Sequence, residues 1–169
     1  MVKRLWHRRA VLSALGALAA TPTRATTSNV IDLGWSDLLP PDAPIVPRLF
    51  SSMVDHDSAP LSSQQPQSTG RRNEWNGKTV RIPGFVVPLD QSSEGITSFI
   101  LVPYVGACIH VPPPPANQLV FVTTEKPFTS SGLFEPVNVT GTFNTTSTYT
   151  HLAQIGYALT ADQIKQHSF

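Results

Sequence analysis

A run of four consecutive prolines at positions 112–115 constrains the fold of this chain more than any other feature. Each proline fixes its φ angle at about −65° and has no amide hydrogen to donate, so the run excludes a helix and a central strand. Such a run favours an extended polyproline II rod, which loses little conformational entropy on folding. We therefore expect a rigid loop here, between two strands.

Five segments that follow the turn signal Asn76-Gly77 have the composition of β-strands, and Gly, Pro, Ser or Asn separates them. The predicted strands are residues 79–89, 98–102, 118–123, 137–144 and 155–159.

Pro83 and Pro88 cannot donate ladder hydrogen bonds, so the first strand must bend or bulge near Gly84, or run along an edge. A long, bent first strand that serves two parts of a sheet is a requirement of small Greek-key barrels. The sequence thus predicts a mainly β fold, a small five-stranded OB-like Greek-key barrel. Residues 160–166 predict a short C-terminal helix over one barrel end, because Thr160 can cap it and Asp162 lies in its first turn.

The N-terminus has the pattern of a cleavable export signal: basic residues, an apolar run over residues 10–20, and small residues at 23–25. The run is shorter than the roughly 20 residues that cross a bilayer as a helix, and no later segment approaches that length. We expect a periplasmic protein with no transmembrane segment in the mature chain. Its export route is Sec or, because of the Arg8-Arg9 pair, twin-arginine.

Removal of the signal peptide, residues 1–25, takes away five basic and no acidic residues and turns the formal net charge of +1 into about −4. The only local basic cluster that remains is Arg71-Arg72, which is too small a footprint for phosphate backbones, so we exclude nucleic acid as a partner. The remaining chain, about 144 residues, can bury a core without disulfides. Cys108 is the only cysteine and cannot form an internal disulfide.

Residues 26–73 are rich in Pro, Ser, Gln and Asp and form a predicted N-terminal arm and flexible linker. Trp35, Leu38 and Leu39 have the spacing of one helical turn, which we expect to pin the arm to the body. Residues 51–70 have almost no large apolar side chains, which indicates a mobile linker or a long surface loop. The barrel domain is predicted over residues 74–169.

Cys108 and His110 stand in the most unusual segment, just before the prolines. If the chain is extended here, both side chains project to one face, and a thiolate and an imidazole can bind Zn²⁺ or Cu⁺ together. Two ligands are too few for a closed site. The candidates for further ligands are His56, His151, His167 and Glu94.

Two other interpretations of this segment stay open. His110 could lower the pKa of the thiol and make the protein a thiol-dependent enzyme. Alternatively, Cys108 is a small buried apolar residue and the proline loop is a fixed recognition edge for a partner. The residues of that predicted partner surface are Tyr104, Pro112, Pro113, Pro114, Pro115 and Asn117.

The segments 75–89 and 99–118 resemble the bacterial domain-of-unknown-function family 3299. The most specific match is Gly-Ala-Cys-Ile-His-Val-Pro-Pro-Pro-Pro at residues 106–115. The resemblance extends over residues 75–166, and Trp-Ser-Asp-Leu-Leu-Pro at residues 35–40 is similar to an N-terminal patch of the family.

The resemblance implies a small exported protein whose genes often stand beside those of transporters for metals, above all zinc, and it implies no established reaction. Lipid-anchored members differ from this chain at the N-terminus. Our leading hypothesis from sequence is a periplasmic metal-binding accessory protein that handles zinc, through Cys108 and His110, for a membrane transporter component. The alternatives are a protein- or ligand-binding module of such a complex, with a structural Cys108, and a thiol-dependent enzyme.

Overall fold

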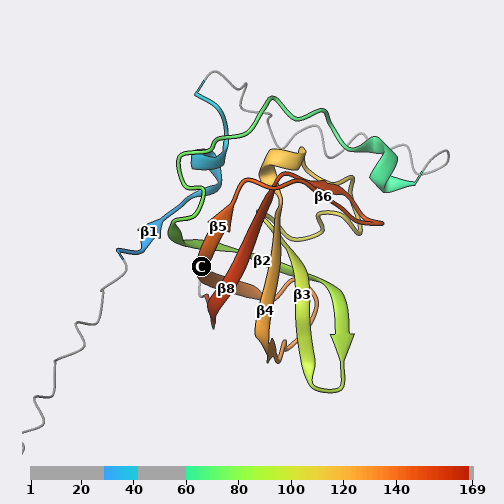
Figure 1. The fold of residues 1–169 in the computed structure, drawn as a ribbon. Coiled ribbons are helices and arrows are strands. Elements are labelled where there is room, and N and C mark those ends of the chain that lie inside the picture. Colours follow the sequence, from blue (N-terminus) through green and yellow to red (C-terminus); the bar gives the residue numbers. More distant parts are fainter. Residues whose placement is uncertain (1–28, 42–59, 168–169) are drawn as a thin grey trace, which may run out of the picture.

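The computed structural model describes residues 29–41 and 60–167, and a barrel of five strands dominates this part of the chain (Figure 1). The barrel strands are β2 (Thr79–Ser92), β3 (Gly95–Val102), β4 (Val120–Phe128), β5 (Pro136–Asn144) and β8 (Tyr157–Gln166).

The strand order is β2-β3-β4-β8-β5, and β5 pairs back with β2 and closes the barrel. The β4–β8 pair is parallel, whereas the other barrel pairs are antiparallel. This arrangement confirms the predicted OB-like Greek-key barrel.

The first barrel strand changes partner along its length. Residues 79–85 of β2 pair with β5, and residues 85–92 pair with β3. Gly84 stands where the partner changes, and a Cβ atom there would lie 2.8 Å from Cγ of Leu101. The strand therefore serves two parts of the sheet, as predicted, while its register shifts lie at residues 88–91 rather than at Gly84.

The predicted C-terminal helix is wrong, because residues 160–166 belong to β8. Tyr157, Leu159 and Ala161 are buried while Thr160 and Asp162 are exposed, which is the period of two that a strand requires. Residues 157–161 pair with β4, and the strand pairs with β5 from residue 158 to residue 166. These long-range hydrogen bonds override the local capping signals at Thr160.

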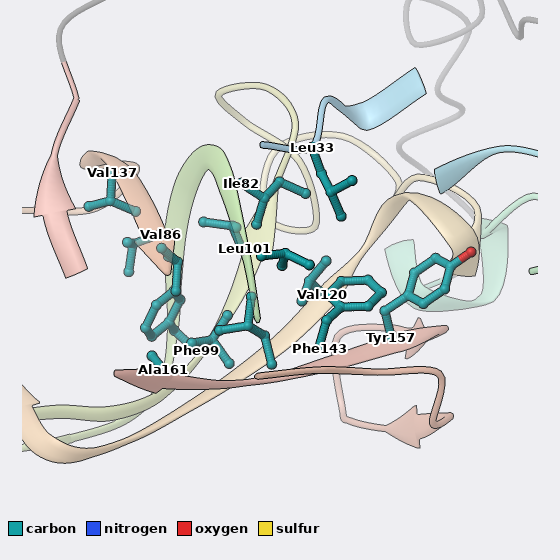
Figure 2. Close-up of a cluster of buried hydrophobic side chains, with 14 of the residues drawn as sticks. Leu33, Ile82, Val86, Phe99, Leu101, Val120, Val137, Phe143, Tyr157 and Ala161 are labelled. Atoms are coloured by element: carbon teal, nitrogen blue, oxygen red, sulfur yellow. The ribbon is translucent and has the colours of Figure 1, made fainter. Parts of the chain in front are cut away.

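The barrel interior is filled by inward-pointing side chains from all five strands (Figure 2). Two aromatic rings contact each other at one end, where the centroids of Phe143 and Tyr157 lie 5.1 Å apart. Among the largest fully buried side chains are Tyr157, Phe99, Phe143, Leu38 and Ile82.

The N-terminal arm is attached to the barrel through β1 (Ile31–Asp32), which pairs in parallel with β2, and through the 3-10 turn η1 (Trp35–Leu38). The indole of Trp35 donates to the carbonyl of Pro83 at 2.8 Å, and Leu38 is fully buried. The predicted single turn that pins the arm is thereby confirmed. No helix in the described residues is long and apolar enough to cross a membrane.

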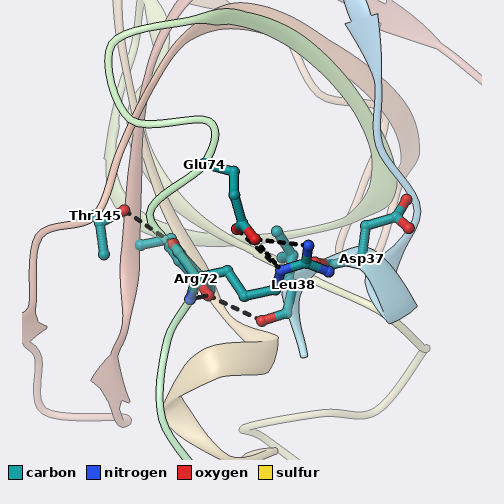
Figure 3. Close-up of polar contacts among 6 residues, drawn as sticks. Asp37, Leu38, Arg72, Glu74 and Thr145 are labelled. Atoms are coloured by element: carbon teal, nitrogen blue, oxygen red, sulfur yellow. Dashed lines mark hydrogen bonds and ion pairs between the residues drawn. The ribbon is translucent and has the colours of Figure 1, made fainter. Parts of the chain in front are cut away.

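Tyr157 ties the arm to the barrel through its hydroxyl group. This hydroxyl donates to the carbonyl of Leu38 at 2.9 Å and accepts from the amide of Arg72 at 2.8 Å. The guanidinium of Arg72 pairs with Glu74 at 2.7 Å (Figure 3) and lies 4.7 Å from the ring centroid of Trp75. Thr145 donates to the carbonyl of Arg72 at 3.2 Å, so several segments meet at this residue.

We expect Tyr157→Phe to lower the free energy of unfolding by about 1–3 kcal/mol, because two backbone groups near a buried hydroxyl lose their partner. Urea titration should show a lower midpoint with an unchanged slope. The control is Tyr149→Phe, at a side chain that is 76% exposed, which should leave the midpoint in place. Equal effects of the two substitutions would contradict this role of the hydroxyl.

Candidate functional site

The connection between β3 and β4, residues 103–119, contains the proline run and is called the signature loop below. Its apolar residues, among them Ala107 and Cys108, pack on side chains of the strands that belong to a second apolar cluster, separate from the barrel core. The buried members of this cluster are Val87, Ile100, Val102, Ala107, Cys108, Leu119, Ala153 and Ile155. Alternation along β3 places Phe99 and Leu101 in the first cluster and Ile100 and Val102 in the second. The signature loop therefore covers the outer face of the barrel.

This cover changes what the fold can bind. OB folds use the outer face around their second and third strands, which correspond to β3 and β4, to bind oligonucleotides and oligosaccharides. In this chain Ile100 and Val102 on that face are fully buried. The hairpin of β6 (Thr148–Tyr149) and β7 (Gln154–Ile155) completes the cover with Ala153 and Ile155. The usual ligand face of the fold is thus occupied by the chain itself.

The backbone before the prolines is a tight turn, so the expected extended conformation of residues 108–110 is wrong. The carbonyl of Gly106 accepts from the amides of Ile109, His110 and Val111 at 3.4, 2.9 and 3.2 Å. Gly106 has a φ of 92° and Cys108 a φ of 69°. A left-handed residue breaks the alternation of side chains on which the convergence of Cys108 and His110 depended.

Cys108 and His110 consequently lie in different environments. Cys108 is only 2% exposed, and burial among apolar side chains raises the pKa of its thiol to about 12. His110 is exposed, and the centroid of its ring lies 6.2 Å from that of Phe134. The sulfur is thus enclosed by an apolar cluster, whereas His110 is exposed to solvent.

The other candidate ligands are dispersed. Glu94 is exposed in the turn between β2 and β3, and His151 is exposed between β6 and β7. His167 lies at the end of β8, where Nδ1 is 2.7 Å from Nδ2 of Asn138. His56 lies outside the described residues. Within residues 29–41 and 60–167, no three His, Cys, Asp or Glu side chains are grouped so as to hold a metal ion.

The predicted partner surface is divided by burial. Pro113, Pro114 and Asn117 are buried, while Tyr104, Pro112 and Pro115 are partly accessible. Asn117 belongs to the 3-10 turn η4 (Ala116–Gln118), and its side-chain amide donates to the carbonyl of Gly70 at 2.7 Å and to Oγ1 of Thr69 at 3.2 Å. Pro113 and Pro114, the inner half of the proline run, are therefore packed inside the structure and do not form an open recognition edge.

Two exposed large apolar side chains lie on two loops that sequence reasoning did not connect. Val105 in the signature loop is 61% exposed, and Leu133 in the β4–β5 connection is 50% exposed. The ring contact between His110 and Phe134 joins these loops. We call Val105, His110 and Leu133 the loop rim.

The β4–β5 connection is held in place by the buried carboxylate of Glu135. This group accepts from the hydroxyl of Ser130 and the amide of Ser131, both at 2.7 Å, and from the side chain of Gln166 at 2.8 Å. Burial raises the pKa of Glu135, but these hydrogen bonds outweigh burial and lower it overall. Phe134 has a φ of 59°, an uncommon value for a bulky residue. In the sequence, the turn-forming residues 130–132 (Ser-Ser-Gly) shortly before the acidic Glu135 could have indicated this carboxylate-held connection.

The buried thiol predicts a specific dependence of stability on pH. The folded state keeps the thiol proton up to about pH 12, whereas an ordinary cysteine loses it near pH 9.0. Its contribution to stability is complete below pH 9 and is lost as the pH rises toward 12, by about 1.4 kcal/mol per pH unit. The difference in unfolding free energy between the native protein and Cys108→Ala should therefore fall by about 2 kcal/mol from pH 7.5 to 10.5. Parallel stability profiles would show a thiol that ionises normally.

Comparison with known proteins places these features in a family. The family model described as protein of unknown function (DUF3299) matches residues 35–166. A crystal structure of a DUF3299 family protein from Pseudomonas aeruginosa PAO1 is similar, with 33% identity and a TM-score of 0.71, over 83% of this chain and 97% of that one. No curated protein matches. The chain belongs to the DUF3299 family.

Proposed function

We propose that this protein is a binding module without catalytic activity, exported from the cytoplasm, that recognises a component of a transport complex through its loop rim. The observation that carries this proposal is the burial of Cys108, which is 2% exposed and has a pKa of about 12. Of the three hypotheses from sequence, the binding module is the one that expects a structural cysteine.

The state of Cys108 weighs against the two competing hypotheses. A thiolate is the reactive form of cysteine both in nucleophilic catalysis and in metal binding. The side chains around Cys108 form an apolar cluster, which favours the neutral thiol. Zinc handling and thiol chemistry both require a thiolate that this environment opposes.

The loop rim has the character of a contact surface. Val105 and Leu133 are two of the three exposed large apolar side chains in the described part of the chain, and exposed apolar surface is a mark of protein association sites. Val105 and Leu133 project from loops that are held by the Gly106 carbonyl and the Glu135 carboxylate. Because the loops are already fixed before binding, less conformational entropy is lost in ordering them when a partner docks. The choice of a transporter component as the partner rests on the association with transporter genes that the family resemblance implies.

Photo-crosslinking in cells that make the protein tests the proposal. A photoreactive residue in place of Val105 should give one discrete protein adduct, and the same residue in place of the exposed Asp162 on β8 should not. Leu133→Asp, combined with the probe at position 105, should reduce the adduct at least about fivefold, because it puts a charge into an apolar contact. The same products from both positions, or an adduct yield that Leu133→Asp does not change, would contradict a recognition surface at the rim.

Thiol reactivity and zinc titration separate the module from the metal-handling hypothesis. At pH 7 a thiol of pKa about 12 is ionised to only about one part in a hundred thousand, so alkylation should be slow in native protein and at least about a hundredfold faster in denaturant. A chelator should not change the native rate. Native protein, Cys108→Ser and His110→Ala should behave alike in a zinc competition titration. A tenfold loss of zinc affinity in either variant would reinstate metal handling.

A further inference from the structure

Residues 60–71, called the strap below, lie against the signature loop and the β6–β7 hairpin. The strap begins with the 3-10 turn η3 (Leu61–Gln64), and none of its residues is buried. Its attachment therefore depends on polar contacts, and apolar burial contributes little.

Gln65 provides a three-point attachment. Its side-chain nitrogen donates to the carbonyls of Pro114 and Gln154, both at 2.8 Å, and its side-chain oxygen accepts from the amide of Gln154 at 2.9 Å. The carboxamide thus pairs with the backbone of β7 as a neighbouring strand would, and at the same time holds the proline run. No other amino acid except asparagine presents two donors and one acceptor on one planar group.

Asn117 provides the second attachment, and this one carries a cost. Its side-chain nitrogen donates to Gly70 and Thr69 of the strap, and the residue is fully buried. Its side-chain oxygen is the only buried side-chain nitrogen or oxygen atom without a hydrogen-bond partner in the described part of the chain. A buried acceptor that lacks a donor bears its full desolvation cost, which water relieves when the segment opens.

We propose that the strap is a latch that opens as a unit while the barrel stays folded, and that its opening exposes the inner half of the signature loop, Pro113, Pro114 and Asn117. Polar attachment lowers the free energy of opening, and the unpaired oxygen of Asn117 lowers it further. In this proposal the latch controls access of a partner to the signature loop, and it therefore rests on the proposed binding function. Release of the strap enlarges the recognition surface from the loop rim to the proline run.

Hydrogen exchange in the full-length protein, without any partner, tests the latch. Gln65→Glu removes both donors and sets an anion against two carbonyls, so the strap, the amides of residues 116–118 and the amide of Gln154 should exchange at least about tenfold faster. The barrel strands should keep their protection. Gln67→Glu, the same change at an exposed position of the same strap, is the matched control and should exchange as the native protein does.

Three outcomes would overturn the latch. The first is acceleration of the barrel strands together with the strap, which would mean that the strap opens only on global unfolding. The second is no effect of Gln65→Glu, and the third is an equal effect of Gln67→Glu. Because this test involves no partner, its failure leaves the crosslinking result untouched, and a failed crosslinking experiment leaves the latch standing.

Discussion

The packing of the signature loop on the outer face of the barrel is the contact on which the rest of the structure depends. Strands β2 and β3 carry apolar side chains on both faces, and Val87, Ile100 and Val102 would otherwise be exposed to water. Burial of each such side chain contributes about 1.5–3 kcal/mol. Apart from the 3-10 turn η4, the loop contains no helix or strand, so its shape follows from the prolines, the Gly106 turn and this apolar contact. The two layers together leave Cys108 sealed and His110 outside.

Sequence reasoning recovers the barrel because its signals are local and redundant. Branched and aromatic residues mark all five strands, and Pro83 and Pro88 require the bend that lets β2 serve two partners. A further signal was present: the continuous apolar run at residues 99–102 is typical of a strand buried on both faces, and it predicts a cover over the outer face. The second half of the last strand, residues 160–166, was wrongly predicted as a helix because Thr160 and Asp162 satisfy a helix rule locally, whereas the pairing with β4 and β5 comes from distant parts of the chain.

The geometry of the candidate site was beyond reach from sequence for a different reason. Convergence of Cys108 and His110 requires an extended backbone, and the bulky residues around them favour one, yet Gly106 alone is enough to start a turn. Whether a cysteine beside such a turn faces solvent or hydrocarbon depends on what lies beneath the loop. The contact of His110 with Phe134 joins residues separated by a whole strand and its flanking loops. The rim is therefore a property of the fold, whereas the cysteine-histidine motif is a property of the sequence.

The signature loop and the strap are attached to the barrel in different ways, and this difference decides which of them can detach first. The signature loop is held by apolar burial, which weakens only when a whole layer separates. The strap above it is held by the amides of Gln65 and Asn117 and by Arg71, whose guanidinium donates to Ser147 at 2.6 Å. Water can replace each of these hydrogen bonds at little net cost. The strap must therefore leave before the loop does, and a partner that meets this face encounters the polar layer first.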